Sequence, residues 1–251
     1  MGTMVTLAAN GIDDPTADSF FATIEKLEAL LSRFRPESEL SQVAAGRLTL
    51  DQADPALREV VVQCEHVRTL TDGDFEFEPD NATTDAPSID VNALAKGWII
   101  DRATLALKLG GASDFFVAAG GDVVVSRPTG ARPFRVGIQD PRDSTAVLGA
   151  MELTHGAVAT SGTYYRGDHI RTTDTASKLT SATVVGPELY LADALATAVL
   201  SSAQHQPSWW QNIDPSYGLL TLDNANTLRW TPPTVGAGKH ELVRWRQAPS
   251  H

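Results

Sequence analysis

The chain has 251 residues, of which 42% are hydrophobic and 20% charged, and its formal net charge is −11. This composition is that of a globular protein with a sizeable core, and the negative charge argues against nucleic acid or an anionic membrane surface as a partner. No run approaches the ~18 apolar residues of a membrane span, the N-terminus lacks the zones of a signal peptide, and the single Cys64 excludes an internal disulfide.

The first half of the chain predicts one strand and three helices. "MVTLAA" has the alternation of a strand, and apolar residues at helical spacing from Phe20 to Phe34 predict a helix with Thr16 or Asp18 as its N-cap. Further helices are predicted over about 55–71 and about 93–109. Gly110 and Gly111 follow the last of them and suit a left-handed C-cap.

The second half is dominated by extended segments that Gly, Pro and Asp separate. The predicted strands read "DFFVAA", "DVVVSR", "PFRVGI", "AVLGAMEL", "AVAT" and "SATVVG", then "GLLTL" and "TLRW" after a helix. Helices and meander-like strands in blocks predict an α+β fold. We expect a single domain over residues 1–251, with a short acidic loop at about 74–88 and a Pro-rich C-terminal tail at about 231–251.

The late helix "LADALATAV" has an apolar stripe on one face and oxygen-bearing side chains on the other. Asp193 and Thr197 are four residues apart, so they lie one above the other. A carboxylate and a hydroxyl suit a hard cation such as Mg²⁺ or Ca²⁺, and the surrounding alanines leave space for a ligand. The alternative is a solvated Asp193 and a Thr197 that bonds to a carbonyl of the preceding turn.

A second stretch with candidate ligand-binding residues is "SIDVNALAKGWIIDRA". Asp90 falls at a strand-to-helix junction, where it either caps the helix or contacts a ligand. Lys96 either projects a cation toward a carboxylate or phosphate, with Gly97 allowing close approach, or extends from the helix into solvent.

Two glycine-containing stretches complete the candidates. Gly120 and Gly121 in "AAGGDVVVS" predict a hairpin and not a dinucleotide-binding loop. In "AVATSGTYYRGDHI", Ser161 and Gly162 offer a hydroxyl and an amide to a phosphate, and His169 suits proton transfer. The alternative is a turn with a surface histidine.

The order of these motifs resembles the ApbE family of FAD:protein FMN transferases. The resemblance runs from "MGTMVTL" through "LSRFRPESELSQVAAG", "DVNALAKGWIID", "AAGGDVVVS", "VGIQDPRD" and "AVATSGTYYRGDHI" to "ADALATAV", that is, from residue 1 to about 200. It implies an ApbE-like, T-fold-like domain of antiparallel-rich sheets packed with helices.

The resemblance also implies site residues. Asp193, Thr197 and the main-chain carbonyl of Ala93 would bind Mg²⁺, or Ca²⁺ in its place, and His169 would be the catalytic base. The flavin-contacting positions that it implies are Met1, Phe34, Asp74, Phe75, Glu76, Asp90 and Lys96.

The expected function is Mg²⁺-dependent transfer of FMN from FAD to a Thr or Ser hydroxyl of a target protein, with release of AMP. One alternative is an FAD pyrophosphatase, the closest chemical variant. The other is a weakened FAD-binding protein, which is favoured because "IRTTDTASK" after His169 lacks the Asp-Pro and Thr-Gly of the family. The partners expected are FAD and a flavin-accepting protein. Because "MGT" starts at residue 1, a cytoplasmic bacterial protein is expected, with an exported form whose N-terminus was trimmed as the alternative.

Overall fold

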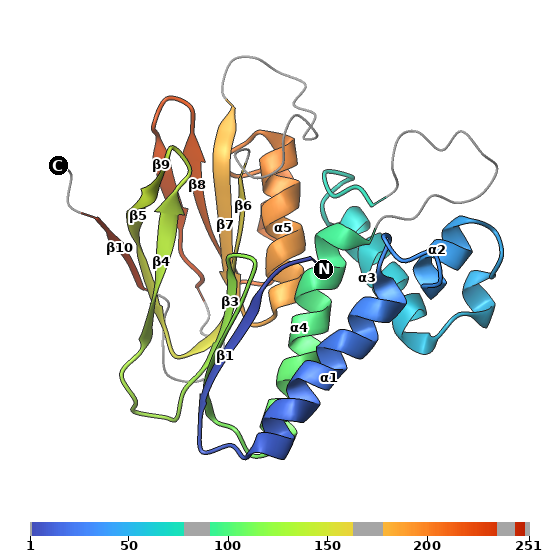
Figure 1. The fold of residues 1–251 in the computed structure, drawn as a ribbon. Helices are drawn as coiled ribbons and strands as arrows, with labels where there is room; N and C mark the ends of the chain where they lie inside the picture. The colour runs from blue at the N-terminus through green and yellow to red at the C-terminus, as the bar shows by residue number, and fades with distance from the viewer. Residues whose placement is uncertain (1, 78–90, 163–177, 235–243, 249–251) are drawn as a thin grey trace.

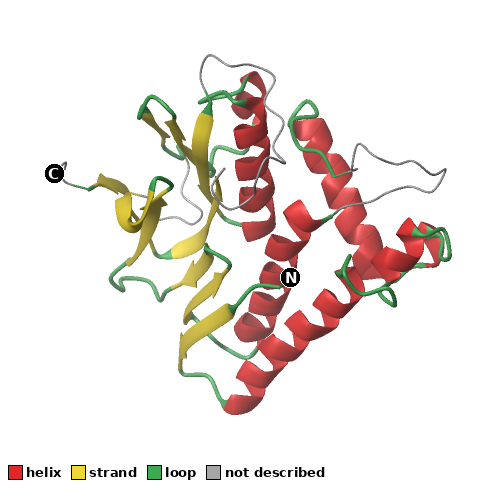
Figure 2. Ribbon diagram, turned by 45° about the horizontal axis from the view of Figure 1, so that its top comes forward, coloured by secondary structure: helices red, strands yellow, loops and turns green. Residues whose placement is uncertain are grey.

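The computed structural model describes residues 2–77, 91–162, 178–234 and 244–248. These residues form three layers, in which helices cover one face of a large sheet and a small sheet covers the other (Figure 1). Figure 2 shows the helices gathered on one side of the strands. The predicted α+β class with antiparallel sheets is confirmed.

Both sheets are antiparallel throughout. The large sheet has the order β1-β2-β3-β6-β7-β8-β9, and the small one has the order β10-β5-β4. The strands are β1 (Val5–Asn10), β2 (Asp114–Ala119), β3 (Asp122–Ser126), β4 (Phe134–Asp140), β5 (Asp143–Leu153), β6 (His155–Gly162), β7 (Leu179–Gly186), β8 (Gly218–Asp223), β9 (Leu228–Thr231) and β10 (Arg244–Gln247).

Five α-helices and two 3₁₀ turns are described. They are α1 (Asp14–Leu31), α2 (Glu39–Ala44), η1 (Leu50–Gln52), α3 (Pro55–Leu70), α4 (Asn92–Leu109), α5 (Leu189–Ser202) and η3 (Ser208–Asn212). The predicted cap of α1 was wrong, because Asp13 caps it and accepts from the Thr16 backbone N–H at 3.0 Å. Pro15 then occupies the first turn, where no intrahelical N–H is needed.

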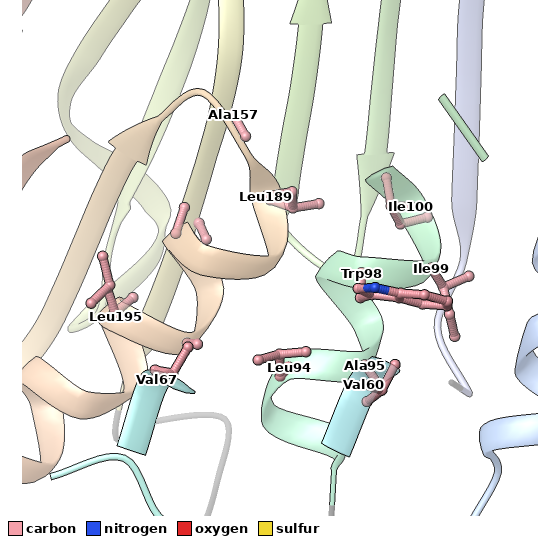
Figure 3. Packing of buried hydrophobic residues seen from close by; sticks show 14 of the residues in the cluster. Val60, Val67, Leu94, Ala95, Trp98, Ile99, Ile100, Ala157, Leu189 and Leu195 are labelled. Carbon is pink, nitrogen blue, oxygen red and sulfur yellow. The ribbon is translucent and has the colours of Figure 1, made fainter. Parts of the chain in front are cut away.

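The large sheet separates two cores because successive side chains on a strand point to opposite faces. On β3, Val124 joins the helix-side core, whereas Val123 and Val125 join the core between the sheets. Figure 3 shows the helix-side core, where Leu94 of α4 and Leu195 of α5 are among the buried side chains.

The hairpin between β2 and β3 matches its prediction. Ala119 and Asp122 pair across the turn, and Gly120 and Gly121 have φ values of 59° and 96°. Two successive residues with positive φ suit a two-residue hairpin turn and favour glycine. The segment expected to be a Pro-rich tail contains β10, which pairs with β5.

Helices α4 and α5 approach each other at backbone distance. A Cβ placed on Gly97 of α4 would lie 2.6 Å from Cα and 2.8 Å from the backbone N of Tyr190 on α5. Only glycine fits there without a shift of one helix, so this contact sets the distance between α4 and α5.

We expect Gly97→Ala to lower the free energy of unfolding by about 1–3 kcal/mol, because the added methyl group meets backbone atoms that cannot rotate away. Chemical denaturation measures the change. Gly137→Ala is the control, since its Cβ would meet nothing closer than Val147 Cγ1 at 3.5 Å. Equal stability of the two variants would contradict this account of the helix contact.

Candidate functional site

A buried cluster of charged side chains lies where α4, α5 and β3 meet. The Lys96 ammonium forms ion pairs with Asp122 Oδ2 and, at 3.1 Å, with Asp193 Oδ2. Asp122 and Asp193 are each 1% exposed, and the Lys96 side chain is 21% exposed. One ammonium between two carboxylates leaves a formal charge of −1 in a region that excludes most water.

Each member of this cluster is held by a regular element. Lys96 precedes Gly97, so the close contact of α4 with α5 brings its side chain within reach of Asp193. Asp122 is the first residue of β3, directly after the two-glycine turn, and its Oδ1 accepts a hydrogen bond from the Thr160 backbone N–H of β6 at 3.1 Å. The site therefore rests on two helices and two strands.

Two hydroxyl groups lie beside the charges. Thr197 Oγ1 is 3.0 Å from Ser161 Oγ, and both residues are buried. Thr197 lies one turn after Asp193 on α5, and Ser161 is near the end of β6. The alternative interpretation of this helix was wrong, because Asp193 is buried and the Thr197 hydroxyl bonds to Ser161 across the helix–sheet interface.

The two carboxylates have oxygen atoms without hydrogen bonds. Oδ2 of both Asp122 and Asp193 is buried and accepts no hydrogen bond from the part of the chain that the structure describes; its polar contact is the ion pair with Lys96. Such oxygens are unfavourable unless a cation balances them. Together with the hydroxyls they form a set of hard oxygen donors, the kind that Mg²⁺ and Ca²⁺ prefer.

No three His, Cys, Asp or Glu side chains are grouped as a metal site among the described residues. A cation here would therefore need hydroxyl or carbonyl oxygens besides carboxylates. Ala93 lies in the first turn of α4, one turn before Gly97, and is partly buried.

The start of the chain packs against the same hairpin. A Cβ on Gly120 would lie 2.7 Å from Thr3 Oγ1, because β1 runs beside β2 with Val5 opposite Ala119. The "MGT" and "AAGGD" segments, which are far apart in the sequence, are therefore neighbours in the fold.

Other predicted flavin contacts have partners outside this cluster or are exposed. Phe34 follows α1, is 78% exposed and has the Arg33 guanidinium 5.4 Å from its ring. Asp74 Oδ2 accepts from Trp209 Nε1 at 2.6 Å, Phe75 is fully buried in the helix-side core, and Glu76 is exposed.

Several assignments stay predictions. Met1, Asp90 and His169 lie outside the described residues. Gly162 ends β6 beside Ser161 and pairs with Ser181. Of the predicted set, the structure brings together Lys96, Ser161, Asp193 and Thr197.

Sequence reasoning missed Asp122. The two-glycine motif accounts for this aspartate as part of a hairpin and does not show what surrounds it on β3. A signal was present, because three valines follow Asp122, and an apolar run of this kind predicts a strand buried on both faces. A carboxylate at the head of such a strand needs a partner.

Helix α5 starts with a cap from α4. Asp101 Oδ2 accepts a hydrogen bond from the Tyr190 backbone N–H at 2.9 Å, in the first turn of α5. Burial raises the pKa of Asp101 to about 6, and the hydrogen bonds from the Tyr190 and Leu189 backbone oppose this rise. This cap fixes α5 next to the point where Gly97 contacts it.

Comparisons with known proteins give a consistent picture. A profile described as the ApbE family matches residues 1–79 and 76–217. An FAD:protein FMN transferase of Rhodobacter capsulatus is 34% identical over 149 residues, which are 55% of this chain and 28% of that protein. The alignment thus spans little more than a quarter of that relative's length.

Solved structures share the fold. The flavin transferase ApbE of Vibrio cholerae superposes with a TM-score of 0.72 at 21% identity, over 92% of this chain and 93% of that chain. The ApbE protein of Thermotoga maritima gives 0.71 at 21% identity, over 91% and 93%. None of the helices built from described residues has the length and hydropathy needed to span a membrane.

The raised pKa of Asp101 predicts a pH-dependent stability. Since the folded-state pKa of about 6 exceeds the ordinary 3.8, the folded protein binds more protons between these values than the unfolded chain does. The Asp101 contribution is therefore fully present below about pH 4 and is lost as the pH rises through about 6. Asp101→Asn keeps an acceptor for Tyr190 but does not titrate.

We expect the stability of the unsubstituted protein relative to Asp101→Asn to increase as the pH falls from 7 to 4.5. Urea denaturation of both proteins across this range measures the difference. A difference that does not change with pH would show that Asp101 titrates as it does in an unfolded chain.

Proposed function

The chain belongs to the ApbE family, and we propose that it is an FAD:protein FMN transferase. In the proposed reaction a Thr or Ser hydroxyl of a target protein attacks the FMN-side phosphorus of FAD. The new phosphoester bond joins FMN to the target, the pyrophosphate bond breaks and AMP leaves. The Rhodobacter capsulatus relative carries this enzyme name, and the fold is that of the ApbE structures.

The observation that carries the proposal is the buried cluster of Lys96, Asp122 and Asp193. Transfer between phosphate groups needs positive charge near the pyrophosphate and little covalent help from the protein. The cluster supplies one ammonium directly, and its uncompensated negative charge suits a divalent cation. A site that only packed the helices against the sheet would be better filled by apolar side chains.

Mg²⁺ fits the donor set, with Ca²⁺ as the alternative cation. Asp193 would hold it through its carboxylate, Thr197 through its hydroxyl and Ala93 through its carbonyl. When bound, Mg²⁺ supplies charge that neutralises the pyrophosphate and its leaving group.

The side chains of this protein then have distinct tasks. Lys96 binds and orients a phosphate oxygen of FAD. Ser161 holds the Thr197 hydroxyl in place through their hydrogen bond. The Gly162 amide, next to Ser161, offers a further donor to a phosphate.

His169 is the proposed base for the attacking hydroxyl. A histidine is suited to this task because its ordinary pKa lies near neutrality. The segment that follows it differs from the family pattern, which favours a weakened FAD-binding protein, whereas FAD hydrolysis to FMN and AMP is the closest chemical variant of the transfer. Water would then replace the protein hydroxyl as the nucleophile.

The test combines the protein with FAD, Mg²⁺ and a Thr-containing acceptor protein or peptide. A mass increase of the acceptor by one bound FMN together with AMP release supports transfer. AMP and free FMN without a modified acceptor support hydrolysis. FAD that stays bound and intact would contradict both reactions.

Asp193→Asn is expected to lower AMP release by about 100-fold or more, because it removes the charged ligand and keeps the side-chain shape. Chromatography of AMP measures the rate. Asp18→Asn is the matched control, since it makes the same change at an exposed position on α1. Thermal melting checks that both variants fold, and undiminished AMP release by folded Asp193→Asn would refute the metal assignment.

A further inference from the structure

One ammonium serves two buried carboxylates in this site. In the described part of the chain, Lys96 is the one cation within ion-pair distance of Asp122 or Asp193. It therefore occupies one oxygen, Oδ2, of the carboxylate to which the proposed function assigns Mg²⁺. Two cations held close together at one buried carboxylate repel each other.

We propose that Lys96 is an exchangeable counter-ion, and that Asp122 is the positioning residue that receives it. Without a divalent cation, the ammonium bridges Asp193 and Asp122. When the cation binds Asp193, the ammonium leaves this carboxylate and stays paired with Asp122, where it faces the phosphates of the substrate. This inference rests on the proposed function only in taking Asp193 as the metal ligand.

Burial explains why a counter-ion is needed. Asp193 is 1% exposed and its Oδ2 has no hydrogen bond from any described residue, so an empty site without Lys96 would hold an uncompensated buried carboxylate. Such a group is strongly unfavourable in a protein interior. The ammonium therefore stabilises the protein without a ligand, and the divalent cation must displace it.

Geometry explains why Asp122 can take over the ammonium. Its Oδ1 is fixed by the Thr160 backbone N–H, and its Oδ2 faces Lys96 and has no competing hydrogen bond from the described residues. Asp122 also starts a strand that is paired on both sides. The partner that retains Lys96 is thus rigid, and the ammonium that moves is partly exposed.

Lys96→Met and Asp122→Asn change the formal charge of the site in opposite directions, so we expect opposite effects on metal binding. The formal charge of the three side chains is −1, and it becomes −2 in Lys96→Met and zero in Asp122→Asn. Lys96→Met removes the competitor of the cation, whereas Asp122→Asn leaves Lys96 with Asp193 as its one charged partner. Metal binding should therefore become tighter in the first variant and weaker in the second.

The experiment titrates Mg²⁺ alone into the full chain, without FAD, by isothermal titration calorimetry. We expect Kd to fall about tenfold or more in Lys96→Met and to rise about tenfold or more in Asp122→Asn. Matched controls are Lys108→Met, at an exposed position of α4, and Asp18→Asn. Both should bind Mg²⁺ as the unsubstituted protein does, and melting curves report folding of every variant.

The double variant separates positioning from simple electrostatics. If Asp122 acts by holding Lys96, Asp122→Asn changes the Mg²⁺ affinity several-fold less when Lys96 is already Met. An equal effect in both backgrounds would show that Asp122 acts on the metal directly and would overturn the proposal.

The remaining outcomes distinguish the two proposals. The metal assignment is overturned if Asp193→Asn binds Mg²⁺ as tightly as the unsubstituted protein. It is also overturned if neither the unsubstituted protein nor Lys96→Met binds Mg²⁺. Either result overturns the exchange as well. The exchange alone is overturned if Asp193→Asn loses Mg²⁺ binding while the Kd for Mg²⁺ is unchanged in both Lys96→Met and Asp122→Asn. Should Lys96→Met fail to fold, Lys96→Gln replaces it with the same expected direction.

Discussion

The close contact between α4 and α5 is the constraint on which the site depends. Gly97 lets the two backbones meet at Tyr190, and any larger residue would separate them. This distance places Lys96, one residue before the contact, within 3.1 Å of the Asp193 carboxylate, which follows the contact by less than one turn of α5. It also allows Asp101, about one turn further along α4, to cap the start of α5. Packing and chemistry are therefore set by the same pair of helices.

The large sheet supplies Asp122 and Ser161 to the site, and a tight turn and the pairing of β3 with β6 set their positions. Gly120 and Gly121 reverse the chain in two residues, so Asp122 begins β3 directly opposite Ala119. The pairing of β3 with β6 then brings the Thr160 N–H to the Asp122 carboxylate and leaves Ser161 facing α5. Because the register of an antiparallel pair also fixes the face of every side chain, a shift by one residue would turn Ser161 away from Thr197. Side chains carried by regular elements in this way are held more precisely than side chains on loops.

Much of this architecture could be predicted from the sequence because it follows from local periodicity. The apolar stripes of α1 and α3 and the alternation along the strands gave the element types and the α+β class. The i, i+4 spacing of Asp193 and Thr197 identified one side of the site. Asp122 could not be assigned in this way, because its partners Lys96 and Asp193 lie on distant segments and only the tertiary packing of α4 against α5 and β3 joins them. Likewise, α2 has six residues and too few turns for a periodic signal, and the expected caps of α1, Thr16 and Asp18, lie inside the helix that Asp13 caps.

The charge balance of the site links stability with function. Burying an ion pair rarely stabilises a protein more than an apolar contact of the same size, and here a second carboxylate is buried without a cation of its own. The arrangement is therefore a poor solution to packing alone, although the surrounding core is well supplied with leucine, valine and alanine. Under the proposed function it would become a good solution when a divalent cation and a phosphate group bind, because the cation would balance Asp193, Lys96 would stay paired with Asp122, and the phosphate would balance the remaining positive charge. In that case the free energy that the unfavourable charge balance costs the protein without ligand would be regained on ligand binding, and a rigid fold could hold charged groups in place for phosphoryl transfer.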